Sequence, residues 1–271
     1  MNTFHWSEYG AGDHRVRCPA CGRRESDRSA GLTIESDGRG VLHCYRCRLV
    51  LTEKGAARTR APRAGKPAMT KLTAISQWGL RLWGECQPIS GVAREYLQAR
   101  RCCVPPEDGD LRWHPSLKHR SGYVGPALVG LITHVQTRKR LSLHRTWITP
   151  TGKADVDPPR MPLANHSTEG GCIRLWPDEA ATYGLAISEG IETALSLAWA
   201  YNPVWATIDA GHMRKFPVLD GVETLVIGCD QDEAGREAAR ECGDRWAAAN
   251  REVLVTRQQK NDLNDVLTEA A

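Results

Sequence analysis

The feature of this sequence that most constrains its fold is a set of four cysteines near the N-terminus. Cys18 and Cys21 form one C-x-x-C pair, Cys44 and Cys47 form a second, and 22 residues separate the two pairs. Each pair offers two thiolates from one tight turn, and zinc prefers four such ligands in a tetrahedron. The residues between the pairs predict a β-hairpin that brings the second pair over the first. We therefore expect residues 1–52 to be a zinc ribbon that binds one structural, non-catalytic zinc ion.

The other cysteines and the apolar stretches bear on where the protein works. In a reducing compartment, paired C-x-x-C motifs bind a metal more often than they form disulfides. The first fifteen residues contain two acids and lack the apolar core of a secretory signal. No apolar run reaches the roughly 20 residues that a membrane span needs. We therefore expect a cytoplasmic protein with no membrane partner. The six cysteines outside the motifs are predicted to be ordinary small buried residues: Cys86, Cys102, Cys103, Cys172, Cys229 and Cys242.

Charge is distributed unevenly along the chain, although the formal net charge is only +4. Residues 1–71 carry a net charge of +7, residues 72–188 carry +4, and residues 189–271 carry −7. A basic N-terminal part suits a polyanionic partner, and an acidic C-terminal part suits one only if the acids hold cations. A solvated surface with uneven charge explains the same numbers equally well. Aromatic residues interleaved among the arginines of the ribbon favour single-stranded nucleic acid as the partner.

Composition and periodicity divide the chain into four parts. Residues 53–71 hold six Lys or Arg, two Pro and two Gly, and they predict a basic flexible linker. Residues 72–182 combine helical spacing with two strands joined by a basic turn, which predicts a mixed α+β segment. Residues 183–271 alternate short apolar strands with helices, which is typical of a parallel sheet covered on both faces. The expected fold class is α/β, with the β-rich ribbon at residues 1–52.

Three acidic residues follow two of the predicted parallel strands. Glu189 directly follows one apolar strand, and Asp230 and Asp232 follow another as D-Q-D. Because the carboxyl ends of parallel strands meet at one edge of a sheet, we expect these side chains to converge. Their mutual repulsion calls for a divalent cation, Mg²⁺ or Mn²⁺. An acid after a strand can instead cap a helix, and that alternative competes strongly for Glu192 on the first helical turn.

These motifs carry a resemblance to a known family. The stretch E-G-I-E-T-A-L from Glu189 and the stretch D-Q-D-E-A-G-R from Asp230 resemble the TOPRIM domain of DnaG-type primases, topoisomerases and some nucleases. Together with the ribbon, the chain resembles the primases of phages and plasmids within the DnaG-type superfamily. The stretch K-N-D-L-N-D-V-L from Lys260 resembles the element that follows TOPRIM in such proteins. The resemblance implies a Rossmann-like C-terminal domain with a mainly parallel sheet.

The resemblance also implies roles for individual residues. It makes Glu189, Asp230 and Asp232 the catalytic residues and magnesium ligands, with possible support from Asp262 and Asp265. It also implies that four basic residues contact nucleotide or nucleic acid: Arg145, Lys153, Arg160 and Arg236. For any single one of the three in the middle segment, a solvated surface base is an equally good interpretation.

The function that the resemblance implies is that of a DNA primase. Such an enzyme makes short RNA primers on single-stranded DNA from ribonucleoside triphosphates, and its ribbon aids template recognition. The motif G-x-x-x-x-G-K-[ST] does not occur here, so we expect any replicative helicase to be a separate chain. Two alternatives stay open: a TOPRIM-family nuclease that uses the same acids, and a non-catalytic, zinc-dependent mediator that binds single-stranded DNA. Nucleotide incorporation, strand cleavage, and binding that survives loss of the acids distinguish the three.

Overall fold

The chain forms two compact units, Met1–Ala68 and Met69–Ala271. The division falls inside the predicted linker, of which residues 54–70 lie outside the described residues, so its flexibility stays a prediction. Among the described residues, no helix is both long and apolar enough to cross a membrane. The computed structural model describes residues 4–22, 24, 26–53 and 71–256.

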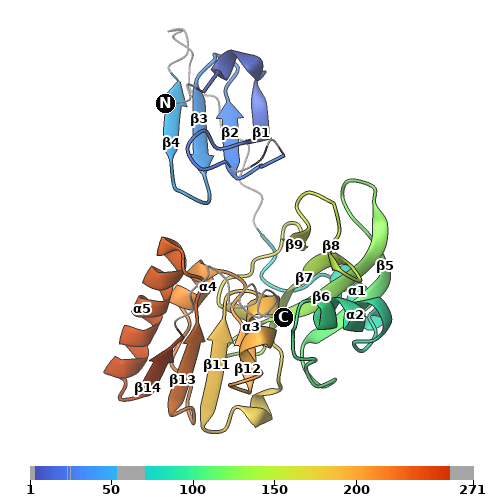
Figure 1. Ribbon diagram of the computed structural model, residues 1–271, viewed down its shortest axis with the longest axis vertical. Coiled ribbons are helices and arrows are strands. Elements are labelled where there is room, and N and C mark those ends of the chain that lie inside the picture. Colours follow the sequence, from blue (N-terminus) through green and yellow to red (C-terminus); the bar gives the residue numbers. More distant parts are fainter. Residues whose placement is uncertain (1–3, 23, 25, 54–70, 257–271) are drawn as a thin grey trace. The chain divides into compact units, whose positions relative to one another are not determined.

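The first unit is a four-stranded antiparallel sheet in the order β1-β2-β3-β4 (Figure 1). Alternate residues of β2 and β3 are buried, among them Leu32 and Leu42, so this small sheet has one apolar face. The hairpin between β2 and β3 turns at Asp37 and Gly38, where the positive φ of 82° suits glycine. The elements are η1 (Trp6–Glu8), β1 (Gly12–Val16), β2 (Ala30–Ile34), β3 (Gly40–Cys44) and β4 (Val50–Glu53).

The second unit begins with two helices and a β-rich segment. The basic turn predicted between two strands joins β6 to β7, which are the longest strands of the structure. The sheet continues from this segment into the C-terminal part, so one ten-stranded sheet serves the whole unit. The elements of the segment are α1 (Gln77–Glu85), α2 (Gly91–Ala99), β5 (Leu111–Lys118), β6 (Val124–His134), β7 (Arg140–Thr149), β8 (Gly152–Lys153), β9 (Arg160–Pro162) and β10 (Gly171–Arg174).

The C-terminal part has the alternation of strands and helices that the sequence predicts. Strands β14, β13, β11 and β12 lie side by side in that order and are all parallel (Figure 1). The path from β11 to β12 and the path from β13 to β14 run in opposite directions along the sheet. Right-handed crossovers therefore place α3 and α5 on opposite faces. The elements are η2 (Asp178–Ala180), β11 (Gly184–Ser188), α3 (Ile191–Leu197), β12 (Val204–Ala206), α4 (Ala210–Arg214), β13 (Thr224–Gly228), α5 (Glu233–Ala248) and β14 (Glu252–Val255).

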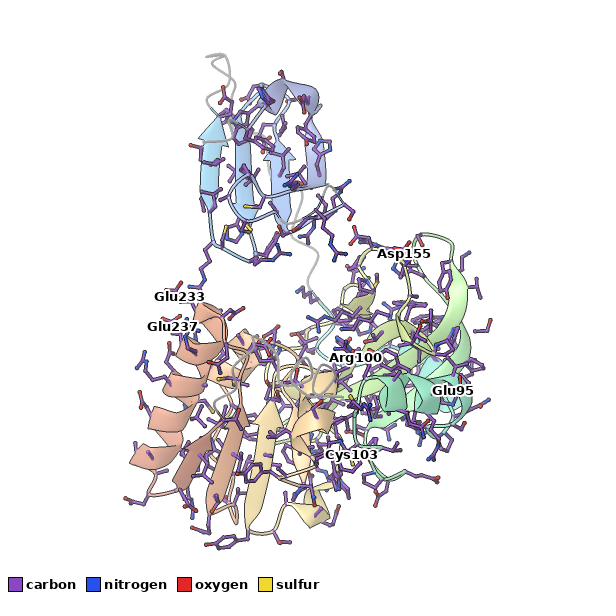
Figure 2. The ribbon with its side chains drawn as sticks, in the orientation of Figure 1. Glu95, Arg100, Cys103, Asp155, Glu233 and Glu237 are labelled. Carbon is purple, nitrogen blue, oxygen red and sulfur yellow. The ribbon has the colours of Figure 1, made fainter. Side chains whose placement is uncertain are left out.

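Two apolar cores lie on the two faces of this sheet. One core joins α2 and α3, and it includes Tyr96 and Leu195, both fully buried. The backbone of Cys103, after the end of α2, donates to the carbonyl of Leu195 on α3; Figure 2 labels Cys103. The other core joins α4 and α5 around Trp246 and Phe216. The face that carries α3 is thus the face that meets the middle segment.

Strand β10 is, like β5, β8 and β9, one of the elements that the sequence did not reveal. It pairs antiparallel with β12 on one side and with β6 on the other, and so joins the two parts of the sheet. All four of its residues are buried. A strand this short, buried on both faces, shows no alternation of apolar and polar residues, so periodicity cannot detect it.

Candidate functional site

The four cysteines of the first unit converge, as their spacing predicts. The Sγ atoms of Cys18 and Cys47 are 3.5 Å apart, those of Cys21 and Cys44 are 3.6 Å apart, and all four lie within 4.8 Å of one another. A tetrahedron with Zn–S bonds of about 2.3 Å has sulfur–sulfur edges of about 3.8 Å. The cluster therefore fits one zinc ion held by four thiolates.

Backbone amides support the thiolate form at one of these ligands. The backbone N–H groups of Arg46 and Cys47 each lie 3.4 Å from Sγ of Cys44 and donate to it. Burial alone would raise the pKa of Cys44, but these amides outweigh it and lower the pKa to about 6. The turn after β3 thus prepares a thiolate before any metal binds.

Carboxylates gather at the carboxyl edge of the parallel strands in the second unit. Asp230 follows β13, Glu189 follows β11, and Asp209 follows β12, in the order of the strands across the sheet. The strand order reverses between β11 and β13, which is where open α/β sheets bind their ligands. The sequence interpretation missed Asp209, although the signal was of the same kind: an acid shortly after an apolar strand.

Glu189 is one of the enclosed acids of this row. A Cβ atom on Gly235 would lie 2.8 Å from Oε1 of Glu189, so this first-turn glycine of α5 makes room for the carboxylate. Among the described residues, no donor reaches that buried oxygen. Burial, with the charges of Asp230 and Asp232, raises the pKa of Glu189 to about 8, and Asp209 adds to the effect. A buried carboxylate oxygen without a donor, beside like charges, fits a divalent cation.

Asp232 combines a structural role with an exposed carboxylate. Its Oδ1 accepts from the backbone N–H of Gly235 at 2.8 Å, so Asp232 is the N-cap of α5, on which Figure 2 labels Glu233. The predicted base Arg236 folds back and donates to the carbonyl of Gln231, which steadies the D-Q-D loop. In the described part of the chain, only the cysteines form a cluster of three or more potential ligands within 4.8 Å of one another. A magnesium ion, which keeps several waters, suits ligands that stand farther apart.

Strand register decides which of the predicted bases reach this edge. Arg160 pairs with Thr146 of β7, and Lys153 pairs with Ile148, so both lie on the same face of β7. Arg160 reaches the start of α3, where its Nη1 lies 3.8 Å from the Cβ position of Gly190. Lys153 is on β8 and Arg160 is on β9; Figure 2 labels Asp155, in the connection between these two strands.

Arg145 is not brought together with the other two bases. Arg145 is next to Thr146 on β7, and successive side chains of a strand point to opposite faces. Arg145 therefore lies on the face opposite to Arg160 and Lys153. Its Nη2 donates to the carbonyl of Pro162 at 2.8 Å, its guanidinium lies over the Trp147 ring, and burial lowers its pKa to about 10. The structure thus gives Arg145 a packing role in this unit.

Glu192 links the acidic edge to the bases. Its Oε1 accepts from the Tyr96 hydroxyl at 2.7 Å and lies 3.2 Å from Nζ of Lys153. Burial alone would raise the pKa of Glu192, but Lys153, the Tyr96 hydroxyl and Arg160 outweigh it and hold the pKa at about 2. Glu192 lies on the first turn of α3, yet its carboxylate makes this ion pair rather than a cap, because Gly190 is the N-cap. The remaining predicted acids, Asp262 and Asp265, lie outside the described residues.

Family models match most of the second unit. Residues 184–271 match the model of a Toprim domain, and residues 73–175 match a domain of unknown function, DUF7146. The C-terminal part of this chain is therefore a Toprim domain, which confirms the resemblance that the E-G and D-x-D motifs carry.

Solved structures with a similar chain path are primases. The primase fragment of the bacteriophage T7 primase-helicase protein is 20% identical, with 95% of each chain covered and a TM-score of 0.46. The Aquifex aeolicus primase, with its zinc-binding and RNA polymerase domains, is 14% identical over 97% of this chain and 78% of that one, with a TM-score of 0.44. A DnaG primase catalytic domain bound to single-stranded DNA is 14% identical over 71% of this chain and 74% of that one, with a TM-score of 0.45. A comparison with curated proteins gives no match.

Proposed function

We propose that this protein is a DNA primase, which makes short RNA primers on single-stranded DNA from ribonucleoside triphosphates. The observation that carries the proposal is the row of Toprim carboxylates flanked by two bases of the middle segment. Glu189 and Asp230 end neighbouring parallel strands, and Arg160 reaches the start of the helix that follows Glu189. Acids that hold a divalent cation, beside bases that hold phosphates, are what nucleotidyl transfer requires.

Each group has a distinct task in this proposal. Glu189, Asp230 and Asp232 would hold Mg²⁺ or Mn²⁺, which when bound lowers the negative charge on a triphosphate and favours attack by a 3′-hydroxyl. Arg160 and Lys153 bind the phosphates of the incoming nucleotide. Glu192 keeps Lys153 in place through the buried ion pair, so the base is preorganised before substrate arrives.

The remaining partners follow from the first unit and from the sequence. The zinc ribbon, whose exposed face carries Arg15 over the ring of Tyr45, contacts template bases by stacking and by charge. The cysteines of the ribbon hold one structural zinc. A replicative helicase is a further expected partner. None of the ten cysteines forms a disulfide, which suits a reducing cytoplasm.

The test is incorporation of labelled ribonucleotides on single-stranded DNA with magnesium. We compare the wild type with Asp230→Asn, Asp232→Asn and the exposed control Asp220→Asn. Asparagine also caps helices, so Asp232→Asn keeps α5 intact while it removes the charge. We expect short RNA products from the wild type and the control, and a loss of about a hundredfold or more in the other two variants.

Other outcomes assign the chain to one of the alternatives. No RNA from folded, zinc-loaded protein, with the template intact, would refute a primase that acts alone and favour a DNA-binding mediator. Template cleavage that the same two variants abolish would show a Toprim nuclease instead. Equal incorporation by all four proteins would place the chemistry elsewhere in the chain.

A further inference from the structure

An open cavity of about 460 Å³ lies at the same sheet edge as the carboxylate row. It is lined by the loop before β10, by α4 with the residues that follow it, and by Lys71. Asp209 belongs to both features, because it lines this cavity and its charge raises the pKa of Glu189. The cavity is thus directly beside the candidate catalytic edge.

Asp209 and His212 form a fixed polar wall of the cavity. Oδ1 of Asp209 accepts from Nδ1 of His212 at 2.7 Å and from its backbone N–H at 2.9 Å. Nε2 of His212 lies 2.7 Å from the carbonyl oxygen of Thr168. Both partners accept only, so both ring nitrogens donate and the ring carries a positive charge. The Asp209 side chain remains 58% exposed, so its carboxylate is accessible to a ligand in the cavity.

Two lysines provide further positive charge at the cavity. Lys71 and Lys215 both line it and both are exposed. Neither forms an ion pair with another residue in the described part of the second unit. With His212, they give three cationic groups around one cavity, against the carboxylates of Asp209 and Glu169.

This combination of charges points to one class of ligand. Lysines and an imidazolium bind phosphates, and a carboxylate with a free oxygen accepts from the hydroxyls of a ribose. A simple anion site has no use for the carboxylate, and a cation site has no use for the lysines. A ribonucleotide uses both, with its ribose at Asp209 and its phosphates at the lysines.

We propose that this cavity is the subsite for the initiating ribonucleotide, with Asp209 selecting the ribose and Lys71 and Lys215 binding the 5′-phosphates. Because the charge of Asp209 acts on Glu189, a ribose held at Asp209 lies near the acids where the first bond must form. The cavity lies on the α4 side of the sheet, whereas Arg160 and Lys153 approach from the α3 side. The acids therefore stand between two separate phosphate sites, as the joining of two nucleotides requires. The inference rests on the proposed function for the reaction but not for binding.

Binding is measured first, by equilibrium dialysis of labelled ATP and GTP and their 2′-deoxy forms against the full chain without magnesium. We expect the wild type to prefer the ribonucleotides, and Lys215→Glu to weaken their binding at least tenfold. Lys118→Glu, which changes an exposed lysine on β5, is the matched control. Asp209→Asn keeps the cap of α4 and should lose the preference for ribose. Asp220→Asn, the exposed acidic control, should bind as the wild type does.

Several results would overturn the inference. These are no binding by the wild type at millimolar nucleotide, equal binding by the Lys215 and Lys118 variants, or a loss in Asp220→Asn as large as that in Lys215→Glu. A defect of Lys215→Glu confined to single-stranded DNA binding would assign the cavity to the template backbone instead. Melting temperatures of all variants control for folding.

The reaction then separates this subsite from the proposed function as a whole. Lys215→Glu should raise the KM for starting a primer at least tenfold, yet extend a preformed RNA dinucleotide at the wild-type rate. Equal losses in starting and in extension would refute an initiating subsite. If the wild type makes no RNA at all, the proposed function fails while the dialysis result still decides whether the cavity binds ribonucleotides.

Discussion

Replacing Glu192 with glutamine tests the ion pair on which the arrangement of bases depends. The carboxylate is 7% exposed and Lys153 is 32% exposed, so the pair is largely removed from water. A pKa lowered from 4.5 to about 2 corresponds to about 3 kcal/mol of stability at neutral pH. Breaking a buried pair costs about 3–5 kcal/mol, and partial exposure of the lysine places this pair at the low end. We expect Glu192→Gln to lose about 3 kcal/mol.

The assay is urea denaturation of the full chain, followed by tryptophan fluorescence. Trp147 and Trp246, which are fully buried in the second unit, contribute to this signal. Because the pKa of Glu192 is lowered on folding, its contribution is present above the pKa of the unfolded state, about 4.3. It disappears as the pH falls toward 2. The difference between wild type and variant should therefore be full at pH 7 and shrink between about pH 4.5 and pH 2.

Two controls separate charge from packing. Tyr96→Phe removes only the hydroxyl that donates to Glu192 and should cost about 1 kcal/mol. In a Lys153→Met background, Glu192→Gln should cost much less than it does in the wild type, because the attraction is already gone. A Glu192→Gln protein as stable as the wild type at pH 7, or a loss that does not change with pH, would refute this account.

Three further predictions concern zinc, the acidic edge and the bases. Cys44→Ser should lose the bound zinc, measured by elemental analysis, and the fold of the first unit, measured by proteolysis, while Cys103→Ser keeps both. In metal-free protein, Glu189→Gln should match the wild type in melting temperature near pH 4 and exceed it increasingly up to about pH 8, because the raised pKa of Glu189 penalises its charged form in the fold. A gain that is the same at all pH values would contradict this. Arg160→Ala should raise the KM for nucleotide about tenfold with the fold intact, whereas Arg145→Ala should lower the melting temperature instead; the reverse pattern would show that the faces are misassigned.

Most of the features that the sequence predicted correctly depend on the spacing of residues close together in the chain. Two C-x-x-C pairs define the zinc cluster because the ligands of each pair lie within one turn of chain. Glu189 and the D-Q-D acids were found because each directly follows an apolar strand, and parallel strands share an edge. These features depend on neighbours within a few residues, so no knowledge of the tertiary structure is needed to see them.

What the sequence could not reveal depends on register and on distant contacts. Nothing in the sequence distinguishes the roles of Arg145 and Arg160. The register pairs Arg160 with Thr146, and Arg145, one residue before Thr146, therefore lies on the opposite face. From sequence alone, a capping role stayed open for Glu192. Its partners could not be seen, because Lys153 and Tyr96 come from a short strand and a helix far away in the sequence. Strand β10 can be recognised only from its pairing with β12 and with β6, which the sequence does not show.

The positions of the acids and bases in the fold explain the uneven charge of the chain. Residues 189–271 carry a net charge of −7, and that segment supplies the whole row of carboxylates at the sheet edge. The bases on the α3 side come from the more basic segment before it, on β8 and β9. Bases from the acidic segment itself would pair with its own carboxylates, as Arg214 does with Glu237. Lys153 and Arg160 come instead from a separate part of the sheet, and Lys153 pairs with Glu192 on α3. The row formed by Glu189, Asp230 and Asp209 therefore keeps its negative charge for a cation.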